Sequence, residues 1–150
     1  MRVWRIARGC YAPLDGEGAR LNGGRWNSPG RPVVYTAQSA ALAVLEVLVW
    51  TDPEDIPDDL RLFEIELPDD AAIDDVETAA LPGNWTEPGS PACAAAGDAW
   101  LAAASSLALA VPSAVLPEER NLLINPRHPD AARVRVAESR PFAFDLRLLR

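Results

Sequence analysis

Glu46 is the residue whose surroundings most suggest chemistry. It is the only polar residue in the run AALAVLEVLVW, residues 40–50. Leu42, Leu45 and Val49 have the spacing of a helix face that packs on a core, and Glu46 belongs to that face. A carboxylate there is costly unless it is paired or faces a cleft. Two interpretations follow: a structural group, ion-paired or at a helix edge that reaches solvent, and a functional carboxylate on a cleft floor.

Arg25 is the second candidate, within GGRWNSPG at residues 23–30. A guanidinium is suited to bidentate binding of phosphate, and the two glycines would let backbone and guanidinium come close to such a ligand. The alternatives are an ion pair with Glu46 and an arginine in an ordinary surface turn.

Three other side chains have weaker local patterns. Tyr35 ends the strand-like VVYT and is interpreted either as a core tyrosine or as a ligand contact. Ser113 follows Pro112 in LAVPSAV, where a hydroxyl can point into a cleft. No Gly-x-Ser-x-Gly motif surrounds it, and His128 lies between prolines in NPRHPD. A Ser-His-Asp triad is therefore not supported, and His128 is predicted to structure its loop.

The elements that must position these residues follow from the hydrophobic pattern. In LRLFEIEL (60–67), alternation of apolar and charged residues predicts a half-buried strand. A helix is predicted over 39–50 with Ser39 as its N-cap, and residues 68–91 are loop-rich. The remaining elements are strands at 3–7 and 32–37, a helix at 92–105, the segments 107–111, 121–126 and 133–139, and a C-terminal stretch with Phe142, Phe144, Leu146 and Leu148 on one face. The pattern predicts a single α+β domain over 1–150, with a mixed or antiparallel sheet.

Charge narrows the range of partners. Residues 1–31 contain six arginines and two acids, a net +4, and the rest carries −12, which together make the −8 of the whole chain. The acidic total argues against direct nucleic-acid binding. The local excess of arginine indicates a small basic pocket for a compact anionic ligand. Neither a GxGxxG nor a GxxxxGK[ST] phosphate loop occurs.

Other composition features exclude further classes. No run of about 20 uncharged apolar residues occurs, so no membrane span is expected. Arginines interrupt the N-terminal MRVWRIARGC where a signal peptide needs an apolar core, which predicts a cytoplasmic protein. Cys10 and Cys93 are expected to be buried free thiols. With one histidine and no cysteine cluster, metal-free chemistry is expected.

The order of GGRWNSPG, VVYTA, ALAVLEVLVW, LAVPSAV and NLLINPRHPD resembles the RES-domain family, the toxins of Xre–RES toxin–antitoxin pairs. The resemblance extends from VWRIA to FAFDLRL and covers nearly the whole chain. Arg25, Glu46 and Ser113 match the arginine, glutamate and serine that name the family, and Tyr35 matches the family's tyrosine.

The resemblance implies a diphtheria-toxin-like ADP-ribosyltransferase fold, with a split, mostly antiparallel sheet and NAD in a cleft between its halves. It implies NAD as the substrate, degraded by hydrolysis or phosphorolysis, with arrest of growth as the result. Transfer of ADP-ribose to a host metabolic enzyme is the alternative, and a non-catalytic antitoxin-binding module is another. A cognate Xre-type helix-turn-helix antitoxin would block the cleft. A homodimer and a toxin–antitoxin hetero-oligomer both stay open.

The roles expected of the residues are hypotheses drawn from this resemblance and from glycosidic chemistry. Glu46 would hold the ribose and stabilise positive charge. Arg25 would hold a phosphate, Tyr35 would border the nicotinamide, and Ser113 would bind the ribose or the nucleophile. Further cleft contacts are expected from Arg5, Gly24, Trp26 and Asn121.

Overall fold

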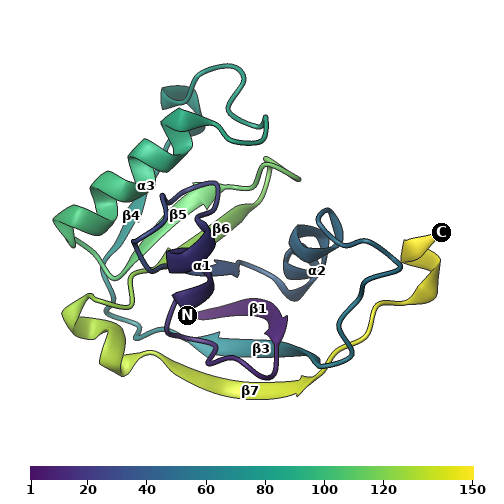
Figure 1. Cartoon of the computed structure of the whole chain (residues 1–150). Coiled ribbons are helices and arrows are strands. Elements are labelled where there is room, and N and C mark those ends of the chain that lie inside the picture. Colours follow the sequence, from purple (N-terminus) through teal and green to yellow (C-terminus); the bar gives the residue numbers. More distant parts are fainter.

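The computed structural model describes all 150 residues and contains one seven-stranded sheet in the order β4-β5-β6-β2-β1-β3-β7 (Figure 1). The strands are β1 (Arg2–Arg8), β2 (Val34–Ala37), β3 (Leu60–Glu66), β4 (Ile73–Asp75), β5 (Ala108–Pro112), β6 (Arg120–Ile124) and β7 (Arg135–Pro141). Only β4 and β5 are parallel; every other neighbouring pair is antiparallel. The predicted α+β class with a mostly antiparallel sheet is confirmed.

The sheet is nearly divided between β1 and β2. These two strands share a single paired position, Trp4 with Ala37, whereas β1 pairs with β3 from Arg2–Glu66 to Arg8–Leu60. Two sub-sheets result, β4-β5-β6-β2 and β1-β3-β7, which meet at one point. In Figure 1, β5 and β6 lie above β3 and β7, with α2 (Ala40–Leu48) to the right. The expected split sheet is therefore present.

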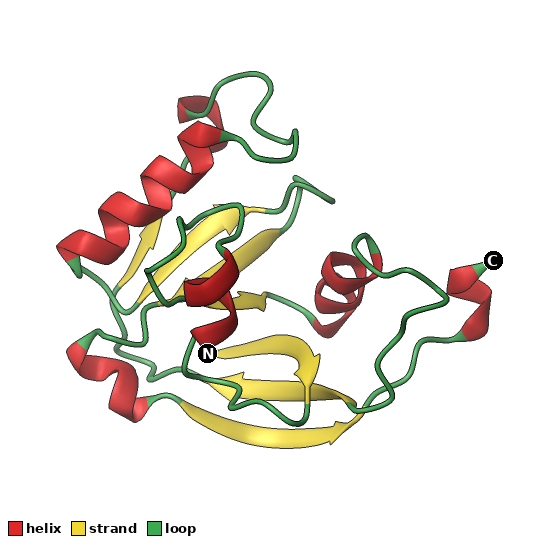
Figure 2. Ribbon diagram, in the orientation of Figure 1, coloured by secondary structure: helices red, strands yellow, loops and turns green.

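The helices are short and lie outside the sheet (Figure 2). Besides α2 they are α1 (Glu17–Asn22) and α3 (Pro91–Ala103), with 3-10 turns η1 (Thr78–Ala80), η2 (Pro129–Arg133) and η3 (Leu146–Leu149). The Ser39 hydroxyl accepts a hydrogen bond from the Leu42 amide, which confirms the predicted N-cap of α2. Helix α1 is not predicted by the sequence pattern. None of the helices has both the length and the apolar character needed to cross a membrane.

The core confirms the alternation in β3. Phe63, Ile65 and Leu67 are buried, whereas Glu64 and Glu66 are partly exposed. Glu64 and Glu66 both pair with Arg2 on the neighbouring strand β1. One face of the strand therefore packs inward while the other carries cross-strand ion pairs.

The structure contradicts two predictions. The C-terminal residues do not place four apolar side chains on one face, because Leu146 is 80% exposed and Phe144 is buried. Asp145 accepts a hydrogen bond from the Arg147 amide and so starts the turn η3, which ends the extended chain. Cys93 is buried as predicted, but Cys10 is exposed, because it lies in the turn after β1.

Candidate active site

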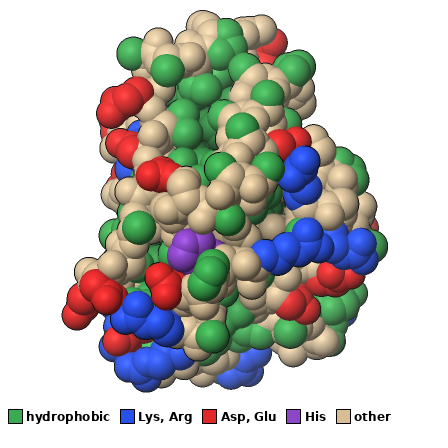
Figure 3. All heavy atoms as spheres, turned by 90° about the vertical axis from the view of Figure 1, so that its left-hand side faces the viewer, with side chains coloured by type: hydrophobic (Ala, Val, Ile, Leu, Met, Phe, Trp, Pro, Cys, Tyr) green, Lys and Arg blue, Asp and Glu red, His purple; other side chains and the backbone are tan.

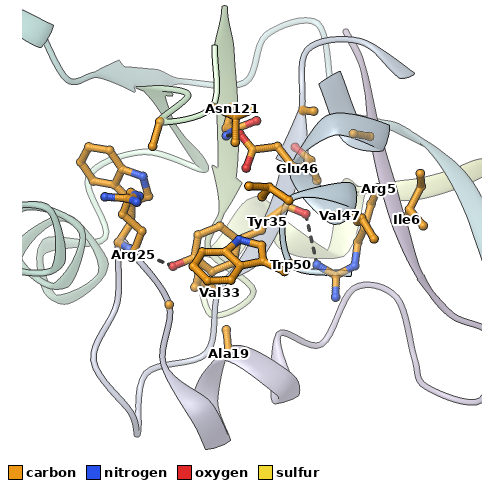
Figure 4. Close-up of a pocket in the computed structure, with 18 of the residues that line it drawn as sticks. Arg5, Ile6, Ala19, Arg25, Val33, Tyr35, Glu46, Val47, Trp50 and Asn121 are labelled. Atoms are coloured by element: carbon orange, nitrogen blue, oxygen red, sulfur yellow. Dashed lines mark hydrogen bonds between the residues drawn. The ribbon is translucent and has the colours of Figure 1, made fainter. Parts of the chain in front are cut away.

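A cavity of about 1060 Å³ opens where the two sub-sheets separate. Its lining includes Arg5 from β1, Tyr35 from β2, Glu46 from α2 and Asn121 from β6 (Figure 4). The loop that carries Arg25 completes one wall. The structure thus brings together Arg5, Arg25, Tyr35, Glu46 and Asn121, all predicted from the sequence as site residues.

The Glu46 carboxylate is held through one oxygen only. Its Oε1 accepts hydrogen bonds of 2.6 Å from the Ser113 hydroxyl and 2.6 Å from the Asn121 amide nitrogen. No cation pairs with Glu46, so the structural ion pair considered from the sequence is wrong. Its Oε2 has no protein donor and is the oxygen left for a ligand in the cavity. Glu46 is also the only acidic residue in the lining.

Ser113 lies behind Glu46 and does not line the cavity. Its side chain is fully buried, and its hydroxyl donates to Glu46 while accepting from the Val115 and Leu116 amides. The single proton of the Ser113 hydroxyl is therefore already committed to the hydrogen bond with Glu46. The expectation that Ser113 contacts the ribose or the nucleophile is wrong in this structure, because Glu46 stands between the serine and the cavity.

Two buried polar atoms in the cavity wall have no protein partner: Arg5 Nε and Asn121 Oδ1. Arg5 is fixed by a 3.1 Å hydrogen bond from its Nη1 to the Tyr35 carbonyl, which crosses the opening between β1 and β2. Burial lowers the pKa of the Arg5 guanidinium, which remains charged at neutral pH. An unpaired buried donor and acceptor are costly unless a ligand satisfies them, so both atoms are available to bind one.

Arg25 is anchored to the segment 85–87. Its Nη1 donates to the Trp85 and Glu87 carbonyls at 2.7 and 2.9 Å, and its Nη2 donates to the Thr86 carbonyl at 3.1 Å. A guanidinium has five N–H donors, so two remain for a ligand. Arg25 does not pair with Glu46, and it is not a free arginine in a surface turn. It anchors the segment 85–87 beside the cavity.

The two cavity arginines differ from the other four in residues 1–31. Arg2, Arg8, Arg20 and Arg31 each pair with an acidic side chain. Neither Arg5 nor Arg25 has an acidic partner, and both line the cavity. On the face shown in Figure 3, basic side chains lie next to acidic ones over the lower half of the molecule. The predicted small basic pocket is therefore present.

Tyr35 holds the Arg25 loop through its hydroxyl. That group donates to Asn27 Oδ1 at 2.6 Å and accepts from the Trp26 amide at 3.1 Å. Burial raises the pKa of the Tyr35 phenol far above its ordinary value, so the phenol stays protonated. The ring borders the cavity, but the hydroxyl is committed to the loop.

Asn27, which no sequence pattern distinguishes, is the centre of that loop. It is buried, and its amide nitrogen donates to the carbonyls of Ala19, Ser28 and Arg31. Asn27 also closes a tight turn with Gly24, since the two residues exchange backbone hydrogen bonds of 3.0 and 3.4 Å.

Backbone conformation and packing within the protein explain the two glycines that precede Arg25. A Cβ on Gly24 would lie 2.7 Å from the Tyr35 hydroxyl oxygen. Gly23 has a φ of 72° and caps the end of α1. The Tyr35 hydroxyl therefore requires the bare backbone at Gly24, which also lines the cavity. Trp26 is among the residues that line the cavity, as predicted, but it is only 2% exposed and packs on Trp85 in the core, with ring centroids 6.5 Å apart.

Helix α3 supports the same loop from outside the cavity. A Cβ on Gly97 would lie 1.6 Å from the Trp26 carbonyl oxygen, so only glycine permits this contact. The neighbouring Asp98 accepts a hydrogen bond of 2.9 Å from the Ser28 backbone amide and one of 2.6 Å from the Ser28 hydroxyl. No local pattern in the alanine-rich helix predicted these contacts.

His128 plays the structural role predicted for it. Its Nδ1 accepts a hydrogen bond from the Asp130 amide and starts η2. It does not line the cavity, and the Ser113 hydroxyl donates to Glu46 instead. A Ser-His-Asp triad is absent.

A family model described as the RES domain matches residues 2–145. The chain belongs to the RES-domain family. Among its RES relatives is "Toxin Res" of Pseudomonas putida (strain KT2440), 43% identical over 94% of this chain and 97% of the relative. Another is "Prs ADP-ribosylating toxin" of Sphingobium sp. (strain YBL2), 39% identical over 98% of this chain and 96% of the relative.

A solved structure shares the fold of this RES domain. The M. tuberculosis MbcT–MbcA toxin–antitoxin complex contains a chain that matches with a TM-score of 0.77 and 24% identity, over 95% of this chain and 84% of that one. The similarity supports the split-sheet architecture of the RES fold.

Proposed function

We propose that this protein is the toxin of a toxin–antitoxin pair and cleaves the nicotinamide–ribose bond of NAD. The observation that carries the proposal is the Glu46 carboxylate, held on Oε1 by two donors and free on Oε2, in a cavity that also contains two arginines without acidic partners. A fixed anion in a cavity that also holds two cations is complementary to a ribose that gains positive charge in a ligand with a pyrophosphate.

The chemistry needs few groups. The C1′–N bond breaks and its electron pair moves to the pyridinium nitrogen, so nicotinamide leaves as a neutral molecule without protonation. The ribose passes through an oxocarbenium-like transition state, which a preorganised negative charge stabilises. A nucleophile then bonds to C1′ and releases its proton. Water gives ADP-ribose, and phosphate gives ADP-ribose phosphorylated on that same carbon.

Each cavity residue has a role in this proposal. Glu46 Oε2 accepts from a ribose hydroxyl and faces the developing charge. Asn121 positions Glu46 through its amide nitrogen and offers Oδ1 to the ribose, while Ser113 positions Glu46 from behind. Arg5 Nε and the two remaining donors of Arg25 take the pyrophosphate oxygens. Gly24 lets Tyr35 reach the loop that presents Arg25.

A product assay tests this function. Purified, antitoxin-free protein is incubated with NAD, with and without inorganic phosphate, and products are separated by chromatography. We expect release of nicotinamide. A new phosphorylated sugar product that requires phosphate identifies phosphorolysis, and ADP-ribose in both reactions identifies hydrolysis. Intact NAD in both reactions, in the presence of cell extract as well, would overturn the proposal.

Transfer of ADP-ribose to a protein is the second candidate. It is favoured by the Sphingobium relative, 39% identical, whose name describes it as a Prs ADP-ribosylating toxin. The same bond of NAD breaks, and a nucleophilic side chain of the target replaces water. Cell extract incubated with NAD labelled in the adenosine half would then show one labelled protein band and little free ADP-ribose.

The partner in this proposal is an antitoxin that covers the cavity. The matching fold was solved in a toxin–antitoxin complex, and we propose that the antitoxin of this chain is of the Xre helix-turn-helix type. Co-expression with the neighbouring gene should restore growth and yield a complex that neither binds nor cleaves NAD. A complex that retains full activity would contradict an antitoxin that blocks the cleft.

A further inference from the structure

Trp50 has an exposed indole at the mouth of the cavity. It lines the cavity, yet it is 74% exposed, whereas Trp26, Trp85 and Trp100 are buried. In Figure 4 it projects from the end of α2 across the pocket, in front of the Tyr35 ring. Exposing so large an apolar ring is unfavourable unless something covers it. The indole stacks on no other aromatic ring and on no cation of the protein.

Trp50 lies one helical turn beyond Glu46. Its amide donates to the Val47 carbonyl at 3.2 Å, so the chain still turns where α2 ends. Residues four apart lie on the same side of such a turn, displaced by about 6 Å along its axis. Both side chains line the cavity. A ligand that offers a hydroxyl to Glu46 therefore has its adjacent group within reach of the indole.

We infer that Trp50 is a stacking platform for the nicotinamide ring of NAD, an inference that rests on the proposed function. If Glu46 takes the nicotinamide ribose, the group attached to that ribose is the pyridinium. The adenine is separated from it by a pyrophosphate and a second ribose, too far to reach a residue one turn from Glu46. A pyridinium is planar and cationic, and tryptophan is the aromatic side chain that attracts cations most strongly.

Trp50 then acts in substrate selection. It recognises the half of NAD that leaves, so it should distinguish NAD from ADP-ribose, which lacks the nicotinamide. Stacking with a cation at a partly exposed site corresponds to about threefold to thirtyfold in affinity. Trp50→Leu should weaken NAD binding by that factor and leave ADP-ribose binding unchanged, while Trp50→Phe should lie between.

Binding is measured by calorimetry with NAD and ADP-ribose in a Glu46→Gln background, which slows turnover, with and without Trp50→Leu. Leu21→Ala is the matched control, because Leu21 is an exposed apolar residue outside the cavity lining. Iodide quenching of tryptophan fluorescence adds a direct readout, since Trp50 is the most exposed indole. NAD should protect it from iodide, and ADP-ribose should not.

The outcomes separate the inference from the function on which it rests. An equal loss of affinity for NAD and ADP-ribose in Trp50→Leu would place the indole on the shared adenosine or pyrophosphate part and overturn the inference. Unchanged affinity for both ligands, with no protection from iodide, would overturn it too and leave the exposed indole as a protein contact. Absence of NAD binding and cleavage in every protein, including wild type, would overturn the proposed function itself.

Discussion

The Ser113 hydroxyl donates a 2.6 Å hydrogen bond to Glu46 Oε1 from a position with no access to the cavity. The serine therefore acts on the carboxylate and not on the ligand. It shares this task with Asn121, which approaches the same oxygen from β6. A carboxylate held at one oxygen by two donors keeps its second oxygen in a defined place, which electrostatic stabilisation of a transition state requires.

Replacing Glu46 tests that stabilisation directly. Glu46→Gln keeps the side-chain shape and removes the charge, so we expect a kcat about 10²- to 10³-fold lower, the usual cost of losing one preorganised electrostatic group. Nicotinamide release measures the effect. Unchanged circular dichroism and melting temperature would show that the fold is intact. Wild-type activity in Glu46→Gln would exclude the carboxylate from catalysis.

Ser113→Ala should affect both stability and turnover. The Val115 and Leu116 amides lose their acceptor, which we expect to cost about 1–3 kcal/mol in the free energy of unfolding. Glu46 loses one of two fixed donors, and we expect kcat to fall roughly tenfold, equivalent to about 1.4 kcal/mol in the activation barrier. Urea unfolding and nicotinamide release measure the two effects.

Ser106→Ala is the matched control for Ser113→Ala. Ser106 is also fully buried, and its hydroxyl is hydrogen-bonded to the indole nitrogen of Trp100, outside the cavity. This variant should lose stability without losing turnover in the folded protein. Equal effects on kcat in the two variants would show that Ser113 acts only through stability.

The buried phenol of Tyr35 predicts a specific response to alkaline pH. Burial raises its pKa above the ordinary value, so the folded protein holds this proton more tightly than the unfolded chain. The stability this contributes is complete below about pH 10 and is lost as pH rises from there toward the pKa of the folded protein. The chain has two tyrosines, so Tyr11→Phe leaves Tyr35 as the only one.

Ultraviolet absorbance of Tyr11→Phe then reports one phenol. Its titration midpoint should lie above about 10 in the folded protein and return to about 10 in denaturant. A midpoint that is the same in both states would contradict the hydrogen-bonded, buried position of Tyr35. Tyr35→Phe should remove the alkaline loss of stability described above.

Gly97→Ala tests the support that α3 gives to the Arg25 loop. The new Cβ would lie 1.6 Å from the Trp26 carbonyl oxygen, so α3 or the loop must shift. We expect a loss of about 1–3 kcal/mol in the free energy of unfolding, and a higher KM for NAD because Arg25 is the residue directly before Trp26 and would be displaced with it. Gly83→Ala is the control, since a Cβ there meets nothing within 4 Å. An unchanged KM in folded Gly97→Ala would show that α3 does not position the site.

The local sequence was enough to predict some of the elements around the site, but not α1, whose residues also line the cavity. Apolar spacing and Ser39 located α2, and alternation located β3, because both signals arise within one helix or strand. The same local pattern identified Glu46, since a single carboxylate on an apolar helix face requires a special environment. The local pattern after Pro112 singled out Ser113 only weakly, and the family resemblance strengthened that prediction.

Only the tertiary structure decided what each site residue contacts. Ser113 and Asn121 lie 67 and 75 residues from Glu46 in sequence, and no local pattern encodes that meeting. Nothing in the neighbouring sequence distinguishes Asn27 or Gly97. Their roles arise from contact with Tyr35 and with Trp26, respectively. The sequence by itself determined that a helix would carry a carboxylate to a core-facing surface. Packing of the two sub-sheets determined that this surface opens into a cavity, because side chains from distant segments must converge to form its walls.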